Sequence, residues 1–332
     1  MKTIIKNIVV AFCFLSICQS CEKVLNYSGD DTSQKILINA LANTDTVFTI
    51  SLYKTMFFAD ATFIDPAIID RIKGIVPGDD SQVITDNAEV KITVNSSDEY
   101  PLVFNKQNGR YESSYTPVQG DNIKIEADVP NLKHASATIQ VPTSVAYDIV
   151  NYRQQYDKHF FIDKDGYSDL LCADTTMTIT IRIHDPNGKN YYRLKVRSIA
   201  KKESAIGDAD YYYNTTDRFV SSDIIFKDER LIKSYATIPA YFSDVFDDSV
   251  FDGKDYDFTV DSRMRQGDNP YISIQLQTIS KELYNYIKSI ELYRITDRDS
   301  YTEAIMIYSN IIDGYGIFGG LSGEHKVINF TK

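Results

Sequence analysis

The sequence predicts a mainly β protein with an N-terminal immunoglobulin-like or transthyretin-like β-sandwich. A larger β-rich (α+β) domain with one or two helices is expected to follow. Two observations predict this class. Between residues 35 and 145, short runs of alternating apolar residues recur about every eight to twelve residues with turns between them. Beyond Pro142 the alternating runs are longer, and one segment has helical spacing instead. A chain of 332 residues is long enough for two domains.

Seven runs build the expected sandwich, at residues 35–42, 46–53, 88–94, 100–105, 109–115, 122–127 and 135–142. Asn108-Gly109 lies between two of them, and this dipeptide is a strong hairpin signal because both residues tolerate a positive φ. Residues 56–86 have the composition of a loop, in which a short helix is expected over residues 66–73. The sandwich is expected to end at residue 145, and the second domain to span residues 146–332.

The second domain begins with a predicted β-hairpin. Residues 176–184 alternate between apolar and polar side chains, residues 185–188 (Asp-Pro-Asn-Gly) have the composition of a turn, and residues 191–199 return as a strand. Residues 255–261 and 271–279 are further predicted strands. Ser280 can cap a helix, because apolar residues follow it at helical spacing. These are Leu283, Tyr286, Ile287 and Ile290. Five glycines between positions 314 and 323 permit close chain approach near the C-terminus.

The first residues have the pattern of an export signal with a lipid attachment site. Lys2 and Lys6 precede the apolar run of residues 8–17, which is too short to span a bilayer as a helix. Ser20 then precedes Cys21, and a cysteine directly after the cleavage point is the lipoprotein pattern. We expect residues 1–20 to be removed, Cys21 to be lipidated, and polar residues 21–34 to tether the fold to a membrane. An ordinary cleaved signal with an unmodified Cys21 is the alternative.

Composition argues against several other classes. Of four cysteines, three lie in the signal or at the lipid site, so Cys172 is the one thiol expected in the folded part, without a disulfide partner. The formal net charge is −11 and the acidic residues are spread along the chain, which argues against nucleic acid because its recognition needs basic stripes. The sequence contains no HExxH motif, GxSxG elbow or P-loop. We therefore expect a protein that is not an enzyme.

Two acidic segments are the candidates for site chemistry. Asp163, Asp165 and Asp169 alternate in a way that could direct oxygens toward calcium, the one cofactor considered. A polar turn is the alternative, because Gly166 stands at the fourth rather than the sixth position of an EF-hand loop. Residues 244–257 contain six aspartates among phenylalanines and valines, which fits an apolar anchor beneath a solvated loop. A hydrolase would need two of the chain's carboxylates to converge in a cleft.

Three tripeptides resemble the O-glycosylation acceptor of exported Bacteroidota proteins. They are residues 45–47 (Asp-Thr-Val), 174–176 (Asp-Thr-Thr) and 248–250 (Asp-Ser-Val). A chance origin is the alternative, because the chain is rich in aspartate, serine and threonine.

Over nearly its whole mature length the chain resembles the Bacteroidota outer-membrane lipoproteins grouped as domain of unknown function 4249. The most specific mark is the C-terminal segment of residues 308–319, which contains Asn310, Gly314, Gly316, Phe318 and Gly319. Further marks are Cys21-Glu22, Pro142 and residues 35–52, 87–90, 108–111, 185–193 and 251–254.

The resemblance implies an outer-membrane lipoprotein, of a kind often encoded beside TonB-dependent receptors, and it brings no established catalytic residues. We therefore expect a non-enzymatic accessory or binding role in TonB-dependent nutrient uptake. The expected partners are the membrane, through the lipid, and a TonB-dependent receptor, without nucleic acid. A stand-alone envelope structural or adhesion lipoprotein is the alternative.

Tyrosines of the second domain are the expected contact residues, because exposed tyrosine gives contact area at low entropy cost. They are Tyr191, Tyr192, Tyr211, Tyr212 and Tyr213. Packing within strands and loops is the alternative role for these side chains.

Overall fold

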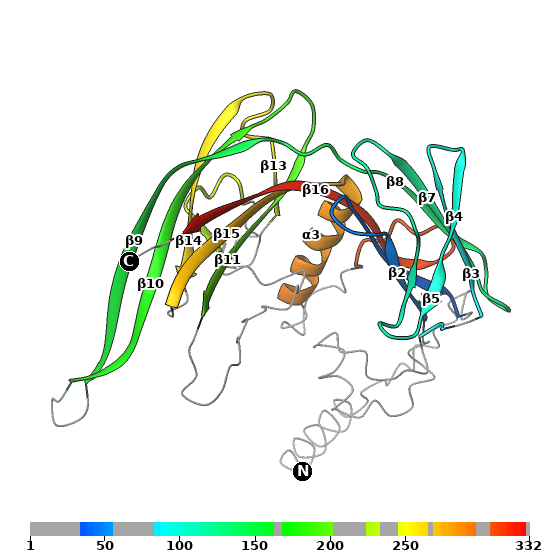
Figure 1. Ribbon diagram of the computed structural model, residues 1–332, viewed down its shortest axis with the longest axis horizontal. Coiled ribbons are helices and arrows are strands. Elements are labelled where there is room, and N and C mark those ends of the chain that lie inside the picture. Colours follow the sequence, from blue (N-terminus) through cyan, green and yellow to red (C-terminus); the bar gives the residue numbers. More distant parts are fainter. Residues whose placement is uncertain are drawn as a thin grey trace, which may run out of the picture. The chain divides into compact units, whose positions relative to one another are not determined.

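The computed structural model describes residues 34–55, 83–85, 87–162, 168–201, 224–232, 245–264, 268–296 and 306–329. All of them belong to one compact unit, Gln34–Lys332. They form a mainly β fold with one helix among the described residues, which confirms the predicted class (Figure 1). The signal, the tether and the helix expected at residues 66–73 lie outside the described residues. No helix in the described part of the chain is long and apolar enough to cross a membrane.

The N-terminal strands lie in two sheets that share one core. One group comprises β1 (Ile36–Asn43), β2 (Thr49–Lys54), β6 (Arg110–Glu112) and β5 (Val103–Asn105). The other sheet comprises β4 (Asp98–Pro101), β3 (Glu89–Val94), β7 (Asn122–Asp128) and β8 (Ala135–Gln140). Alternate side chains of each strand enter the core, because successive residues of a strand project to opposite faces. Ile38 and Ile125 are both fully buried in it. A sandwich is thus present, and its immunoglobulin-like or transthyretin-like topology stays a prediction.

The hairpin predicted at Asn108-Gly109 is confirmed. β5 and β6 pair in antiparallel register from Val103 opposite Glu112 to Asn105 opposite Arg110. Gly109 has a φ of 69°, a backbone angle that glycine adopts without steric cost.

One strand connects the sandwich to the rest of the fold. β16 (Tyr315–Asn329) pairs in parallel with β1 through its first residues and antiparallel with β15 (Asp268–Ile279) through its later ones. The result is an eight-stranded sheet in the order β13-β11-β15-β16-β1-β2-β6-β5. This sheet runs across the boundary expected near residue 145, although the buried apolar residues gather in separate clusters on either side.

A second core lies between two sheets of the C-terminal part. One sheet has the order β12-β14-β10-β9, with β12 (Ile224–Phe226), β14 (Asp255–Met264), β10 (Ser168–His184) and β9 (Tyr147–Ile162). The other contributes β13 (Val245–Asp247), β11 (Tyr191–Lys201) and β15. Met177, Ile179, Ile181 and Ile183 of β10 are fully buried in this core. Rings of Tyr192, Phe226, Phe246, Phe251 and Phe258 pack with centroids 5.4 to 6.5 Å apart.

The hairpin predicted for residues 176–199 is wrong, although both of its strands exist. β10 pairs with β9 and β14, whereas β11 pairs with β13 and β15, so the two strands lie in different sheets. Both strands put apolar side chains into the same core from opposite sides. Burial against the facing sheet therefore outweighs local pairing, and residues 185–190 form a connection between sheets.

The hairpin partner of β10 is β9 instead of β11 (Figure 1). Sequence patterns missed β9 because its first half is mostly exposed and lacks apolar alternation. Val150 and Tyr152, for example, are 47% and 48% exposed. Pairing with β10, rather than an apolar face, defines this strand.

The predicted helix is confirmed as α3 (Lys281–Thr296). Ser280 is its N-cap, since the Leu283 amide donates to Ser280 Oγ over 3.3 Å. Leu283 and Ile287 are buried against Ile279 and Leu321 of the sheet. An amphipathic helix packed on a sheet is therefore observed.

Candidate functional site

The C-terminal motif closes the eight-stranded sheet. The Asn310 carboxamide donates from Nδ2 to the Phe318 carbonyl over 2.8 Å and accepts from the Phe318 amide at Oδ1 over 2.9 Å. This side chain therefore satisfies both backbone groups of Phe318, as a neighbouring strand would. Phe318 is fully buried and packs edge-to-face on Phe48 with ring centroids 5.7 Å apart. The motif residues of the resemblance thus have structural roles.

Glycines of the same motif allow close packing against three neighbours. A Cβ at Gly314 would lie 2.6 Å from the Ile36 carbonyl oxygen, and one at Gly319 would lie 2.9 Å from Leu283 Cβ. Gly316 has a φ of +103° and faces the backbone of Ile38. These contacts explain why a glycine-rich segment is a central strand here, because ordinary side chains would separate β16 from β1 and α3.

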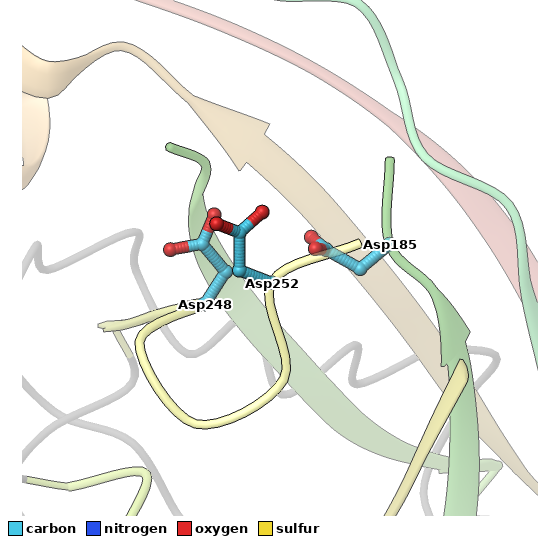
Figure 2. A group of neighbouring side chains, drawn as sticks. All are labelled: Asp185, Asp248 and Asp252. Atoms are coloured by element: carbon cyan, nitrogen blue, oxygen red, sulfur yellow. The ribbon is translucent and has the colours of Figure 1, made fainter. Parts of the chain in front are cut away.

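Three carboxylates converge where two loops meet (Figure 2). Asp185 follows β10, while Asp248 and Asp252 lie in the turn between β13 and β14. One carboxylate oxygen from each lies within 4.8 Å of the other two. In the described part of the chain this is the one group of at least three acidic, histidine or cysteine residues with such spacing. We call it the aspartate latch, defined by Asp185, Asp248 and Asp252.

The latch carboxylates accept hydrogen bonds that cross between the two loops. Asp185 Oδ2 accepts from the Gly253 amide over 2.7 Å, and its other oxygen accepts from the Tyr192 hydroxyl. Asp252 Oδ1 accepts from the Gly188 amide over 2.9 Å. Asp248 accepts from the Asn190 amide over 2.5 Å and from Lys189 Nζ over 2.7 Å. Each loop therefore satisfies backbone groups of the other, and two marks of the family resemblance, residues 185–193 and 251–254, meet in space.

The electrostatics of the latch fit a structural role. Burial raises the pKa of Asp185. The hydrogen bonds from Tyr192 and Gly253 favour its charged form and so oppose this rise. Burial also acts on neighbouring Asp247, but hydrogen bonds from Ser249 and the Lys189 ammonium outweigh it and lower that pKa to about 2. Oxygens of all three latch residues already have protein donors, and Asp248 is fully buried. These hydrogen bonds fit a role of the latch in fixing the two loops.

Beside the latch lies a groove of about 880 Å³. One wall is the connection between β8 and β9, residues 140–146, together with Gly120 and His184. A second wall comes from the β10–β11 connection, with Pro186, Lys189, Asn190 and Tyr191. Residues 278–282, where β15 passes into α3, complete it. The three latch carboxylates are not among the lining residues.

The residues that line the groove are partly apolar and partly polar. Val141 and Val145 are buried, whereas Lys281 is exposed and has no ion pair within the described residues. Lys189 forms ion pairs with Asp247 and Asp248 and lies 5.6 Å from the Tyr191 ring centroid. Concave sites with apolar walls and a few polar groups are where ligands and partner segments usually bind.

His184 ends β10 at the edge of this groove and bridges two other strands. Its Nδ1 lies 2.8 Å from Asp255 Oδ1 of β14, and its Nε2 lies 3.0 Å from Asp148 Oδ2 of β9. Hydrogen bonds with Asp148 and with Asp255 raise the pKa of His184. The two nitrogens point to different carboxylates, so this arrangement is not a shared metal centre.

The contact residues predicted from sequence meet different outcomes. Tyr192 is fully buried among phenylalanine rings, so it cannot contact a ligand and the packing alternative holds for it. Tyr191 is half-buried, packs against Tyr284 with tilted rings whose centroids lie 4.7 Å apart, and lines the groove. Its contact role stays a prediction.

Other predicted residues lie outside what the structure describes. These are Cys21, Tyr211, Tyr212 and Tyr213, together with the side chains of the calcium candidates Asp163, Asp165 and Asp169. Lipidation and calcium binding therefore stay predictions.

Sequence reasoning missed the roles of Asp185 and His184. The sequence indicates only a turn residue at Asp185, and His184 is one of four histidines that lie far apart in sequence. The available signal was that Asp185 immediately follows a strand with a fully buried apolar face, where a polar side chain must find partners. Asp148 and Asp255, which contact His184, and Gly253, which donates to Asp185, are 36 to 71 residues distant in sequence, which no local pattern reveals.

Fold and site together define a mainly β protein in which the aspartate latch joins two loops beside a groove. Its C-terminal motif contributes to packing. The chain belongs to the family described as Domain of unknown function (DUF4249), whose model matches residues 22–326. No curated protein matches it. A solved structure from Corynebacterium diphtheriae, whose description calls it membrane anchored, is similar at 10% identity and a TM-score of 0.20. That match covers 86% of this chain and 60% of the other, and a TM-score this low carries no argument.

Proposed function

We propose that this protein is an outer-membrane lipoprotein, anchored through Cys21, that acts as a non-enzymatic accessory or binding partner of a TonB-dependent nutrient uptake system. The groove beside the latch is the proposed binding surface. The signal-like first residues and Cys21 support the anchor. The uptake context rests on the family resemblance.

The groove is the observation that carries a binding role. Its volume of about 880 Å³ is within the range of small-molecule and peptide sites. The latch fixes the wall that contains Lys189. The amides on either side of this lysine are both held, because Gly188 donates to Asp252 and Asn190 donates to Asp248. A wall fixed in this way lowers the ordering cost of binding.

The hydrogen bonding and location of the three latch carboxylates support a non-enzymatic role. Glycoside or acyl hydrolysis needs an acid and a base that reach the substrate from a cleft. The three converging carboxylates accept bonds from protein donors and lie outside the groove lining. They are therefore poor candidates for this chemistry.

The proposal is tested by affinity recovery from native outer membranes, with a C-terminal tag and mass spectrometry. We expect a TonB-dependent receptor at near-equal amount. Lys281→Glu, at the groove, should reduce this recovery, whereas Lys106→Glu, an exposed lysine in the β5–β6 turn, should not. Recovery of the tagged protein alone from the membrane fraction would favour the stand-alone envelope role instead.

A further inference from the structure

His184 is placed to respond to protons at the groove. Both ring nitrogens face carboxylate oxygens, Asp255 on one side and Asp148 on the other. An ionised carboxylate only accepts hydrogen bonds, whereas a neutral imidazole has one N–H and one acceptor nitrogen. Both contacts can be hydrogen bonds only when the ring carries two protons. A neutral ring would turn a lone pair toward one of the two carboxylates.

The surrounding charges make the two contacts unequal. Asp148 also lies 3.3 Å from Lys326 Nζ of β16, so it keeps a cation when His184 is neutral. Within the described residues, His184 is the one side chain that bonds the Asp255 carboxylate. Arg182 lies on the same sheet face, but its guanidinium already donates two hydrogen bonds of 2.6 and 2.8 Å to the Asp257 carboxylate. Loss of the His184 proton therefore leaves Asp255 without a cation of its own.

The same residue fixes a wall of the groove. The His184 amide donates to the Ala146 carbonyl over 3.1 Å, and Ala146 and Val145 line the groove. Lys326 Nζ donates to the carbonyl of Tyr147, the residue that follows this wall in sequence. After His184 the chain continues into Asp185 of the latch and then into Pro186 of the opposite wall. The backbone of His184 is therefore connected to both walls, while its side chain bonds the first exposed residue after one of them, Asp148.

We propose that protonated His184 clasps the start of β9 to β14, that its deprotonation releases this clasp, and that occupancy of the groove consequently depends on pH. This inference rests on the proposed function, because it describes regulation of the same groove. The clasp is complete below the ordinary histidine pKa of 6.5 and is lost as pH rises through the higher value of the folded state. Asp148, whose pKa is lowered by His184 and Lys326, stays charged throughout that window.

The first test needs no ligand, so its failure is separate from failure of the proposed function. The full chain, labelled on its four histidines, is titrated by NMR in detergent micelles. We expect the His184 ring to titrate above 6.5, with the amides of Ala146 and Asp148 shifting at the same midpoint. Asp255→Asn should lower that midpoint, and His184→Gln assigns the ring signal.

If His184→Gln does not fold, the Asp255→Asn shift alone assigns the signal. A His184 midpoint at or below 6.5, or amide shifts at an unrelated pH, would overturn the clasp. A second test repeats the affinity recovery at about pH 6 and about pH 8 with wild type and His184→Gln. Partner recovery should change with pH in wild type and not in the variant, and an equal change in both would also refute the inference.

Discussion

Gly316 of β16 lies directly against the backbone of Ile38 in β1, where a Cβ would overlap the Ile38 carbonyl oxygen. These two residues are partners in the parallel register of the strands. Glycine is required here for two separate reasons, the close approach and a φ of +103°. The contact joins segments nearly three hundred residues apart and closes the eight-stranded sheet.

Gly316→Ala should therefore lower the free energy of unfolding by at least about 2 kcal/mol, because overlap adds to backbone strain. Urea denaturation of the tagged protein measures this loss. Gly120→Ala is the matched control, since Gly120 also has a positive φ of +89° but has no atom within 4 Å of its Cβ position. An equal loss in both variants would show that φ alone, and not the approach to Ile38, makes glycine necessary.

Replacement of Asn310 by alanine should cost about 1–3 kcal/mol, because the buried amide and carbonyl of Phe318 lose their partner. Thermal unfolding followed by circular dichroism would detect this as a lower midpoint. Asn39→Ala is the control, because Asn39 is an exposed strand residue of β1. Equal midpoints for Asn310→Ala and wild type would contradict the pairing described for Phe318.

The latch predicts unequal roles for two aspartates of one turn. Asp248→Ala should destabilise the fold by about 2–4 kcal/mol, because Lys189 and the Asn190 amide lose a buried acceptor. Asp252→Ala should cost less, since Asp252 is exposed and its carboxylate accepts one hydrogen bond within the described residues, from the Gly188 amide. Chemical denaturation compares the two variants directly. If Asp252→Ala proved the more damaging, the assignment of Asp248 as the central acceptor would be wrong.

Exposure separates the three tripeptides that resemble glycosylation acceptors. Asp45, Thr46 and Val47 are all exposed in the β1–β2 turn, whereas Thr175 is 5% exposed. In the third tripeptide the acceptor Ser249 is exposed, but the preceding Asp248 is fully buried. If the folded protein is modified in its native host, we expect the glycan on Thr46. Glycopeptide mass spectrometry would locate it, with Thr46→Ala as the control. An unshifted intact mass, or a glycan on Thr175, would refute this.

Local pattern was sufficient for many elements and failed for specific ones. The alternation over residues 176–184, the second half of β10, and the spacing after Ser280 depend on residues within one element, so both were predicted. β9 and β16 were not, because exposed tyrosines and clustered glycines are poor strand signals outside their pairing context. Asp185 illustrates the same limit at the site, since its partners Tyr192 and Gly253 define its role.

The sequence by itself determined the β class, the Asn108-Gly109 hairpin, the capped helix and the family, because these depend on neighbouring residues or on motif identity. Tertiary structure alone decided which strands pair, as when β10 and β11 separate into facing sheets around one core. It also brought Asp185 to Gly253 and His184 to Asp148 and Asp255. The physical reason is that burial of apolar faces acts between distant segments, and the polar side chains then pair with whatever groups that packing places beside them.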